Sequence, residues 1–139
     1  MHSQIFVNLP VKDLKRSVDF FTRLGYTFNP QFTDEQATCM ILGPNLFVML
    51  LVEKFFSSFT NKTITDTAKA NEVLTCVACN SREQVDTLVS KARAAGAQVP
   101  RQPQDHGFMY AHGYEDLDGH TWELIHMTGA PPQHLAESP

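Results

Sequence analysis

The chain has 139 residues, of which 42% are hydrophobic, and its formal net charge is −4 at pH 7. This length and composition suit one folded domain, or two small modules that share a core. The 11 Lys and Arg residues are scattered without a basic cluster, which argues against a nucleic-acid-binding protein. The longest apolar run, residues 46–52, is far shorter than the roughly 20 residues that cross a bilayer, so we expect no membrane partner.

The N-terminus and the cysteines indicate a reducing compartment. Residues 1–4 lack the basic region and the long apolar stretch of a secretory signal. We therefore expect a cytoplasmic protein whose three cysteines stay reduced. Cys76 and Cys79 form a Cys-x-x-Cys pair inside a strand-like run, where an odd separation points side chains to opposite faces. The pair is therefore a poor candidate for redox or zinc chemistry.

The first half of the chain is predicted to form a strand, a helix and three further strands. Residues 5–9 form a short apolar strand that Pro10 closes, and Asp13 stands as the N-cap of a helix that Gly25 ends. A strong turn signal, Gly43-Pro44-Asn45, joins the last two strands. The expected strands after the helix cover residues 26–28, 36–42 and 46–52.

The second half repeats this order after a polar connection over residues 53–71. Ser81 and Gln84 form a capping box before a helix that Gly96 ends. Strands are expected over residues 73–79, 98–101, 108–114 and 121–126, with a turn at 116–119 between the last two. If the connection is helical, Phe55 and Phe59 share a face; they either plug the junction between the modules or cover a ligand.

The two halves can be aligned motif by motif. Val11-Lys12-Asp13 corresponds to Cys79-Asn80-Ser81, and Leu24-Gly25-Tyr26 corresponds to Ala95-Gly96-Ala97. We interpret the chain as a duplicated βαβββ module in an α+β fold, with the two modules forming a curved mixed sheet around a cleft. The modules cover residues 4–52 and 72–127, the connection covers 53–71, and residues 128–139 form a mobile tail within one domain.

Glu123 is the strongest functional candidate because it places a carboxylate in an apolar strand, between Trp122 and Leu124. A charged group inside a sheet is unfavourable without a metal, a hydrogen bond or an opposite charge. Two interpretations stay open. Glu123 is either the remnant of an ancestral site, satisfied by a backbone donor or a tyrosine, or it binds a substrate group or acts as a base.

The expected register gives Glu123 polar neighbours. A four-residue hairpin loop over residues 116–119 places His112 opposite Glu123 and Tyr110 opposite Ile125. Glu123 and His112 are then the catalytic candidates, although the same pattern is compatible with a surface histidine. Asn8, on the same strand face as Phe6, is the other polar group expected in the cleft.

With its duplication and motifs, the chain resembles the vicinal oxygen chelate superfamily, which includes glyoxalase I, extradiol dioxygenases, and bleomycin and fosfomycin resistance proteins. The resemblance covers about residues 4–127. It is carried by Val11-Lys12-Asp13-Leu14, Ser17, Phe20-Phe21, Leu24-Gly25-Tyr26, Ala95-Gly96-Ala97 and Asp116-Leu117-Asp118-Gly119-His120-Thr121-Trp122-Glu123-Leu124.

This resemblance implies where a metal would bind. Metal-dependent members hold one divalent ion by four strand positions, two in each module, occupied by His, Gln or Glu. Here a count from the helix caps gives Phe6 and Leu74, and the third position is Phe47 or Met49. Only Glu123 matches, and one carboxylate cannot replace four ligands. We therefore expect no metal or other cofactor.

The first hypothesis is a metal-independent protein, similar to the bleomycin resistance members, that binds a small molecule as a homodimer. Its apolar cleft would be lined by Phe6, Phe47, Met49, Leu74, Met109 and Ile125, and Glu123 would supply the charged contact. The second hypothesis is a glyoxalase-type lyase or isomerase, or a dioxygenase, in which Glu123 still holds a divalent metal with His112 or with a partner subunit. The third is a scaffold with a filled cleft that acts as an interaction module.

Overall fold

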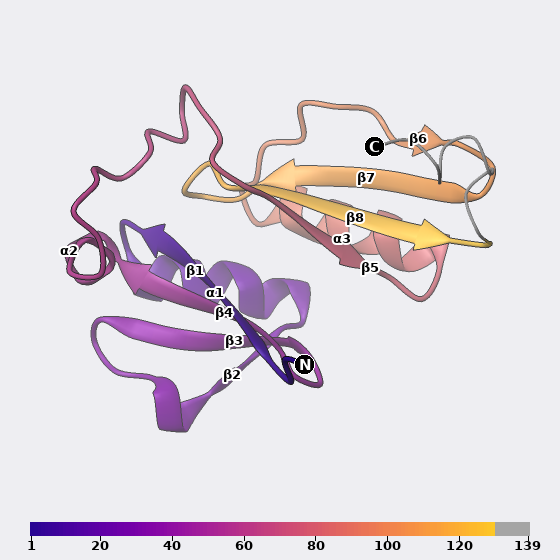
Figure 1. Cartoon of the computed structure of the whole chain (residues 1–139). Helices are drawn as coiled ribbons and strands as arrows, with labels where there is room; N and C mark the ends of the chain where they lie inside the picture. The colour runs from indigo at the N-terminus through magenta and orange to yellow at the C-terminus, as the bar shows by residue number, and fades with distance from the viewer. Residues whose placement is uncertain (130–139) are drawn as a thin grey trace. The chain divides into compact units, whose positions relative to one another are not determined.

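The computed structural model of the chain describes residues 1–129, which fall into two compact units that divide between Ala70 and Asn71. Each unit consists of a four-stranded mixed sheet with a helix against one face (Figure 1). The α+β class and the tandem βαβββ organisation are thus confirmed. The last ten residues of the predicted tail, 130–139, lie outside the described residues.

The first unit is built on a sheet with the strand order β1-β4-β3-β2, in which β1 is parallel to β4 and the other pairs are antiparallel. Phe20, Phe21 and Leu24 are buried on the side of α1 that faces this sheet, where Val48 and Leu50 are also buried. Its elements are β1 (Ile5–Val11), α1 (Leu14–Leu24), β2 (Thr27–Asn29), η1 (Pro30–Phe32), β3 (Ala37–Gly43), β4 (Leu46–Val52) and α2 (Glu53–Ser57).

The predicted boundaries of α1 are confirmed. The Asp13 carboxylate accepts a hydrogen bond from the backbone N–H of Arg16 at 3.1 Å, and Gly25 adopts a left-handed conformation with a φ of 104°. Pro10 does not close β1 as predicted, because the strand continues to Val11. Since β1 lies at the edge of its sheet, a proline without an N–H can be accommodated there.

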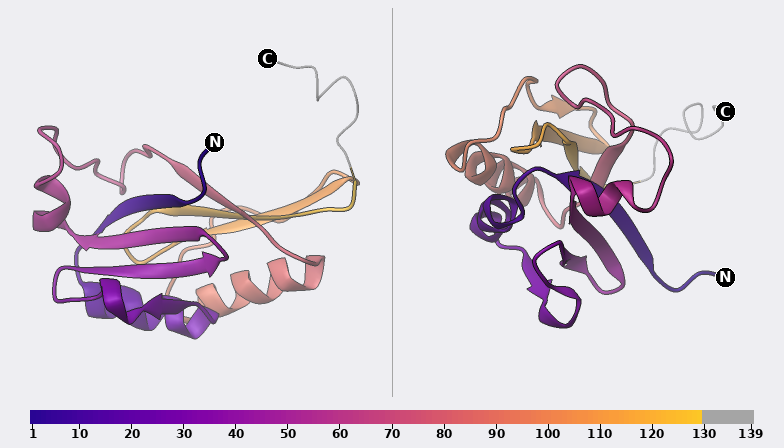
Figure 2. Two further views of the ribbon diagram at one scale, coloured as in Figure 1. Left: turned by 60° about the horizontal axis from the view of Figure 1, so that its bottom comes forward. Right: turned by 90° about the vertical axis from the view of Figure 1, so that its left-hand side faces the viewer.

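The second unit repeats this plan with the strand order β5-β8-β7-β6 and a parallel β5–β8 pair. The capping box is confirmed, since the Ser81 hydroxyl accepts from the Gln84 N–H at 3.0 Å. Helix α3 contacts β7 and β8 along one face of the sheet (Figures 1 and 2). The elements are β5 (Leu74–Ala78), α3 (Arg82–Ala94), β6 (Gln104–Asp105), β7 (Met109–Glu115) and β8 (Thr121–Met127).

The predicted strand over residues 98–101 is wrong. Only Gln98 pairs with the sheet, through an isolated bridge to Glu115. The chain then leaves the sheet and returns at β6, because Pro100 and Pro103 have no N–H to donate to a strand ladder. We call residues 98–103 the strap.

The core of the second unit fixes the direction of Glu123. Val85 and Val89 of α3 are buried, as are Trp122 and Leu124 of β8. Because side chains alternate along a strand, Glu123 lies on the opposite face of the sheet from α3. This face, which we call the Glu123 face, also carries Leu74, Cys76, Ala111, Gly113, Glu115 and Thr121.

Across residues 1–129, none of the helices is long and apolar enough to cross a membrane.

Candidate functional site

A cavity of about 260 Å³ lies within the second unit, on the Glu123 face. The strap and the sheet both line it, and its wall combines charged, amide and small apolar residues. The residues that matter most for its chemistry are Leu74, Arg101, Gln104, Gly113, Glu115 and Glu123. Glu123 thus has a concave, mixed polar and apolar surrounding of the kind that small-molecule sites use.

Gly113 forms the cavity floor opposite Glu123 in the β7–β8 ladder. A Cβ atom at this position would collide with the backbone carbonyl oxygen of Trp122. The close approach of the two strands therefore requires glycine here, and no side chain projects into the cavity from this position. Ala111, the next residue of β7 on the same face, is also small and lines the cavity.

The predicted pairing of His112 with Glu123 is wrong by one residue. Glu115 pairs with Thr121, Gly113 with Glu123, and His112 with Leu124. The cause is the turn, where the Asp116 carboxylate accepts from the backbone N–H groups of Asp118 and His120 at 2.9 and 3.0 Å. These bonds hold His120 inside the loop, which spans residues 116–120 and shifts the register.

His112 nevertheless has a defined role at the cavity. Its Nε2 lies 3.0 Å from the backbone carbonyl oxygen of Arg101 in the strap. Because a carbonyl can only accept, the imidazole must donate, and the proton resides on Nε2. The upstream end of the strap is held by Gln98, whose backbone bonds Glu115 at 3.1 and 2.8 Å. His112 therefore positions Arg101 and does not pair with Glu123.

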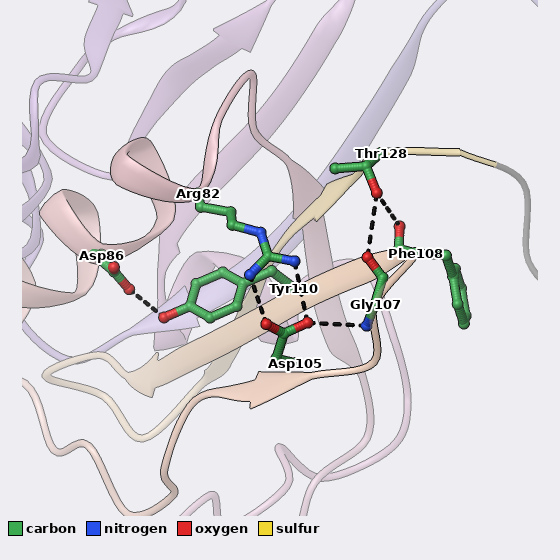
Figure 3. Close-up of polar contacts among 7 residues, drawn as sticks. All are labelled: Arg82, Asp86, Asp105, Gly107, Phe108, Tyr110 and Thr128. Atoms are coloured by element: carbon green, nitrogen blue, oxygen red, sulfur yellow. Dashed lines mark hydrogen bonds and ion pairs between the residues drawn. The ribbon is translucent and has the colours of Figure 1, made fainter.

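Tyr110, the third member of the predicted polar strip, points away from the cavity. Its hydroxyl donates a 2.6 Å hydrogen bond to the Asp86 carboxylate on α3 (Figure 3). This bond raises the pKa of Tyr110 above its ordinary value. The Arg82 guanidinium lies 5.1 Å from the centre of the tyrosine ring, a cation–π distance. The strip of Glu123, His112 and Tyr110 is thus not formed.

The downstream end of the strap is fixed by an ion pair between Arg82 and Asp105 (Figure 3). Arg82 Nη1 and Nη2 donate to the two oxygens of Asp105 at 2.6 and 3.1 Å. The hydrogen bond from Arg82, aided by one from the Gly107 N–H, lowers the pKa of Asp105. A bidentate pair of this geometry ties β6, and with it the strap, to the first turn of α3.

The residue that pairs with Glu123 on β5 is Cys76, two residues after the Leu74 that the count from the helix caps gives. Leu74 pairs instead with Thr121, and it still lines the cavity. Burial, together with the negative charge of Glu123, raises the pKa of the Cys76 thiol. The thiol is therefore held in its protonated, weakly nucleophilic form at neutral pH.

The other predicted cleft residues fall into two groups. In the first unit, Phe6 pairs with Phe47 and Asn8 pairs with Met49, and the two phenyl rings stack with their centroids 4.9 Å apart. In the second unit, Met109 and Ile125 lie on β7 and β8 beyond the residues that line the cavity. The Glu123 cavity thus gathers Glu123, His112 and Leu74 from the predicted set.

Two residues of this region were missed by the sequence analysis. Asp116, predicted only as a turn residue, is buried, and its Oδ2 accepts from the Trp122 indole N–H at 2.9 Å. Burial raises the pKa of Asp116 against the lowering effects of His120 and these hydrogen bonds. The need of a buried indole for an acceptor was a usable signal. Arg101 gave none, because a lone arginine at the end of a predicted strand belongs to no recognisable site motif.

Metal-ligating side chains do not gather in the part of the chain that the structure describes: among residues 1–129, no three His, Cys, Asp or Glu residues are placed to hold one ion. Glu123 has the Cys76 thiol as its neighbour on β5. A carboxylate and a protonated thiol fall short of the three or more protein ligands that transition-metal sites usually take. The described residues therefore do not fit the divalent metal of the superfamily.

Comparisons with known proteins place these observations in a family context. A family model described as "Bleomycin resistance protein-like N-terminal" matches residues 4–43. The comparison with curated proteins gives no significant match. Among solved structures, a hypothetical protein, SA1046 from S. aureus, has 29% sequence identity and a TM-score of 0.76, with 90% of this chain and 94% of that chain covered.

Two further structures share the fold at lower identity. A glyoxalase/bleomycin resistance protein/dioxygenase family enzyme from Burkholderia phytofirmans is 16% identical with a TM-score of 0.72, covering 88% of this chain and 96% of that chain. The fosfomycin resistance protein FosX from Listeria monocytogenes is 18% identical with a TM-score of 0.66, covering 99% of both chains. At these identities the likeness is one of fold.

Proposed function

We propose that this chain binds a small molecule in the Glu123 cavity without a divalent metal. The chain has the fold of the vicinal oxygen chelate superfamily, and its resemblance to that superfamily is confirmed. The carrying observation is a half-buried carboxylate in the wall of a cavity whose floor is kept free by Gly113. Within residues 1–129, no ion pair or hydrogen bond satisfies the Glu123 side chain. A ligand that donates to Glu123 would supply this missing partner.

Two observations favour binding over the alternatives. A metal-dependent lyase, isomerase or dioxygenase needs a ligand set that the described residues do not bring together. A scaffold with a filled cleft is disfavoured by the cavity in the second unit. By resemblance we further propose a homodimer and a cytoplasmic location. His112 does not form a catalytic pair with Glu123, because its imidazole binds the strap.

A fragment screen tests this proposal. Saturation-transfer NMR of a library of polar fragments should give ligands that bind the wild-type protein and lose most of their signal with Glu123→Gln. Glu35→Gln, which removes an exposed carboxylate in the first unit, is the matched control and should bind as the wild type does. Binding that survives Glu123→Gln, or no binder at all, would refute the proposal.

A measurement of metal content tests the proposal that the cavity works without a divalent metal. The protein is incubated with Ni²⁺, Zn²⁺, Mn²⁺ and Fe²⁺, dialysed and measured by plasma mass spectrometry, with Glu123→Gln beside it. We expect no retained ion. About one ion per chain that is lost in the variant would instead support the metal-dependent enzyme.

A further inference from the structure

We propose that the Glu123 cavity takes a small zwitterion, a molecule with an ammonium or similar cation at one end and a carboxylate at the other, such as a free α-amino acid. This inference rests on the proposed function and names its ligand class. It follows from the charges of both signs that line this one cavity: Glu115 and Glu123 from the sheet, and Arg101 from the strap.

The two carboxylates form the cation-binding side. Glu115 lies on β7 two residues beyond Gly113, the partner of Glu123 on β8. The glutamates are therefore diagonal neighbours on one face of an antiparallel pair, a placement with about 7–8 Å between the residues. An ammonium group between them could donate to both carboxylates. It would also relieve the repulsion between two negative charges that share a face.

Arg101 supplies the opposite charge from a fixed position. Its backbone carbonyl is held by His112, and the strap is anchored at Gln98 on one side and at Asp105 on the other. Among residues 1–129, no ion pair joins the Arg101 guanidinium to Glu115 or Glu123. The guanidinium thus remains available for a carboxylate, whose two oxygens match its paired N–H groups.

Electrostatic repulsion disfavours ligands that carry a charge of one sign only, so a zwitterion is the better ligand. A simple cation would place its positive charge in a cavity that Arg101 also lines, and a simple anion would face two carboxylates. A zwitterion satisfies both sides at once. The cavity volume suits a small ligand: about 260 Å³ lies just below the roughly 300–1,000 Å³ of ordinary ligand pockets. Leu74, Pro100 and Ala111 add apolar wall for a short side chain.

Four related probes separate the two charges: L-leucine, its methyl ester, N-acetyl-L-leucine, and N-acetyl-L-leucine methyl ester. The ester keeps only the cation, the acetylated acid keeps only the anion, and the last probe has neither. Binding of each is measured by NMR titration of the wild type, Glu123→Gln and Arg101→Gln. Arg93→Gln, which removes an exposed arginine on α3, is the matched control.

We expect L-leucine to bind most tightly and to be weakened about tenfold by either cavity variant, while Arg93→Gln leaves its affinity unchanged. Arg101→Gln should not weaken the methyl ester, because that probe has no carboxylate. If the ester binds as tightly as L-leucine and depends only on Glu123, the zwitterion inference is overturned while the proposed function stands. If none of the four probes binds, the zwitterion inference is overturned, while the fragment screen with Glu123→Gln still decides the proposed function.

Discussion

The two sheets have the same topology, yet the faces on which the predicted ligand-binding residues lie differ in chemistry. In the first unit, Phe6 stacks on Phe47, and Met49 pairs with Asn8. In the second, the Glu123 face carries two carboxylates over a floor of glycine and alanine. The comparison teaches that the duplicated fold provides two equivalent faces, and that the side chains of the second face, together with the strap, give it a charged cavity.

Removing Asp116 should produce the largest effect, and only the second unit has this buried turn. Asp116→Ala deletes the acceptor of the Trp122 indole and of two backbone N–H groups. Leaving these donors unsatisfied in a buried region should lower the free energy of unfolding by about 4 kcal/mol. Chemical denaturation measures it. A loss below about 1 kcal/mol would show that the hairpin does not depend on this carboxylate.

Filling the floor of the cavity should have the next largest effect. Gly113→Ala places a Cβ against the Trp122 carbonyl oxygen, and the strands must separate to accept it. We expect a loss of about 2–3 kcal/mol by chemical denaturation. Gly129→Ala, where a Cβ would meet no atom within 4 Å, is the control. Equal stabilities for the two variants would contradict the close approach of β7 and β8.

A helix cap in the first unit should matter less than the turn in the second. Asp13→Ala removes the side chain that accepts from the Arg16 N–H, which should cost about 1 kcal/mol by thermal or chemical unfolding. Asp13→Ser keeps an acceptor and should restore most of the stability. If Asp13→Ala lowers the free energy of unfolding more than Asp116→Ala does, the expected order of the two effects is wrong.

The smallest expected effect is the change in folding stability with pH that the Arg82–Asp105 ion pair causes. Arg82 lowers the pKa of Asp105 in the folded protein, so the pair stabilises the fold above the ordinary carboxyl pKa. That contribution is lost as the pH falls through the lowered value. Because the groups are exposed, salt should weaken the effect. The stability of Asp105→Asn should therefore fall less than that of the wild type on acidification from pH 6 to pH 3.

The sequence predicted the parts of the fold that local chemistry controls. Asp13, Gly25 and Ser81 marked the helix ends correctly because caps depend on neighbouring residues. The β7–β8 register was mispredicted because it depends on how the Asp116 side chain folds the turn.

Only part of the candidate site could be predicted from the sequence, for a related reason. Glu123 stood out because its strand neighbours are apolar, which is a pattern along the chain. Arg101 reaches the same cavity through a strap that follows no periodic pattern and is held by the distant His112. Contacts of this kind come from the path of the chain in space, and sequence periodicity does not encode them.

Pro10 in β1 has a consequence for the solubility of the first unit. An exposed sheet edge offers a row of backbone donors that a strand from another molecule could pair with, which is a common route to aggregation. β1 is the edge of its sheet, and its proline removes one donor near the end of this row. The same residue that interrupts the strand pattern in the sequence thereby makes this edge a poorer template for an intruding strand.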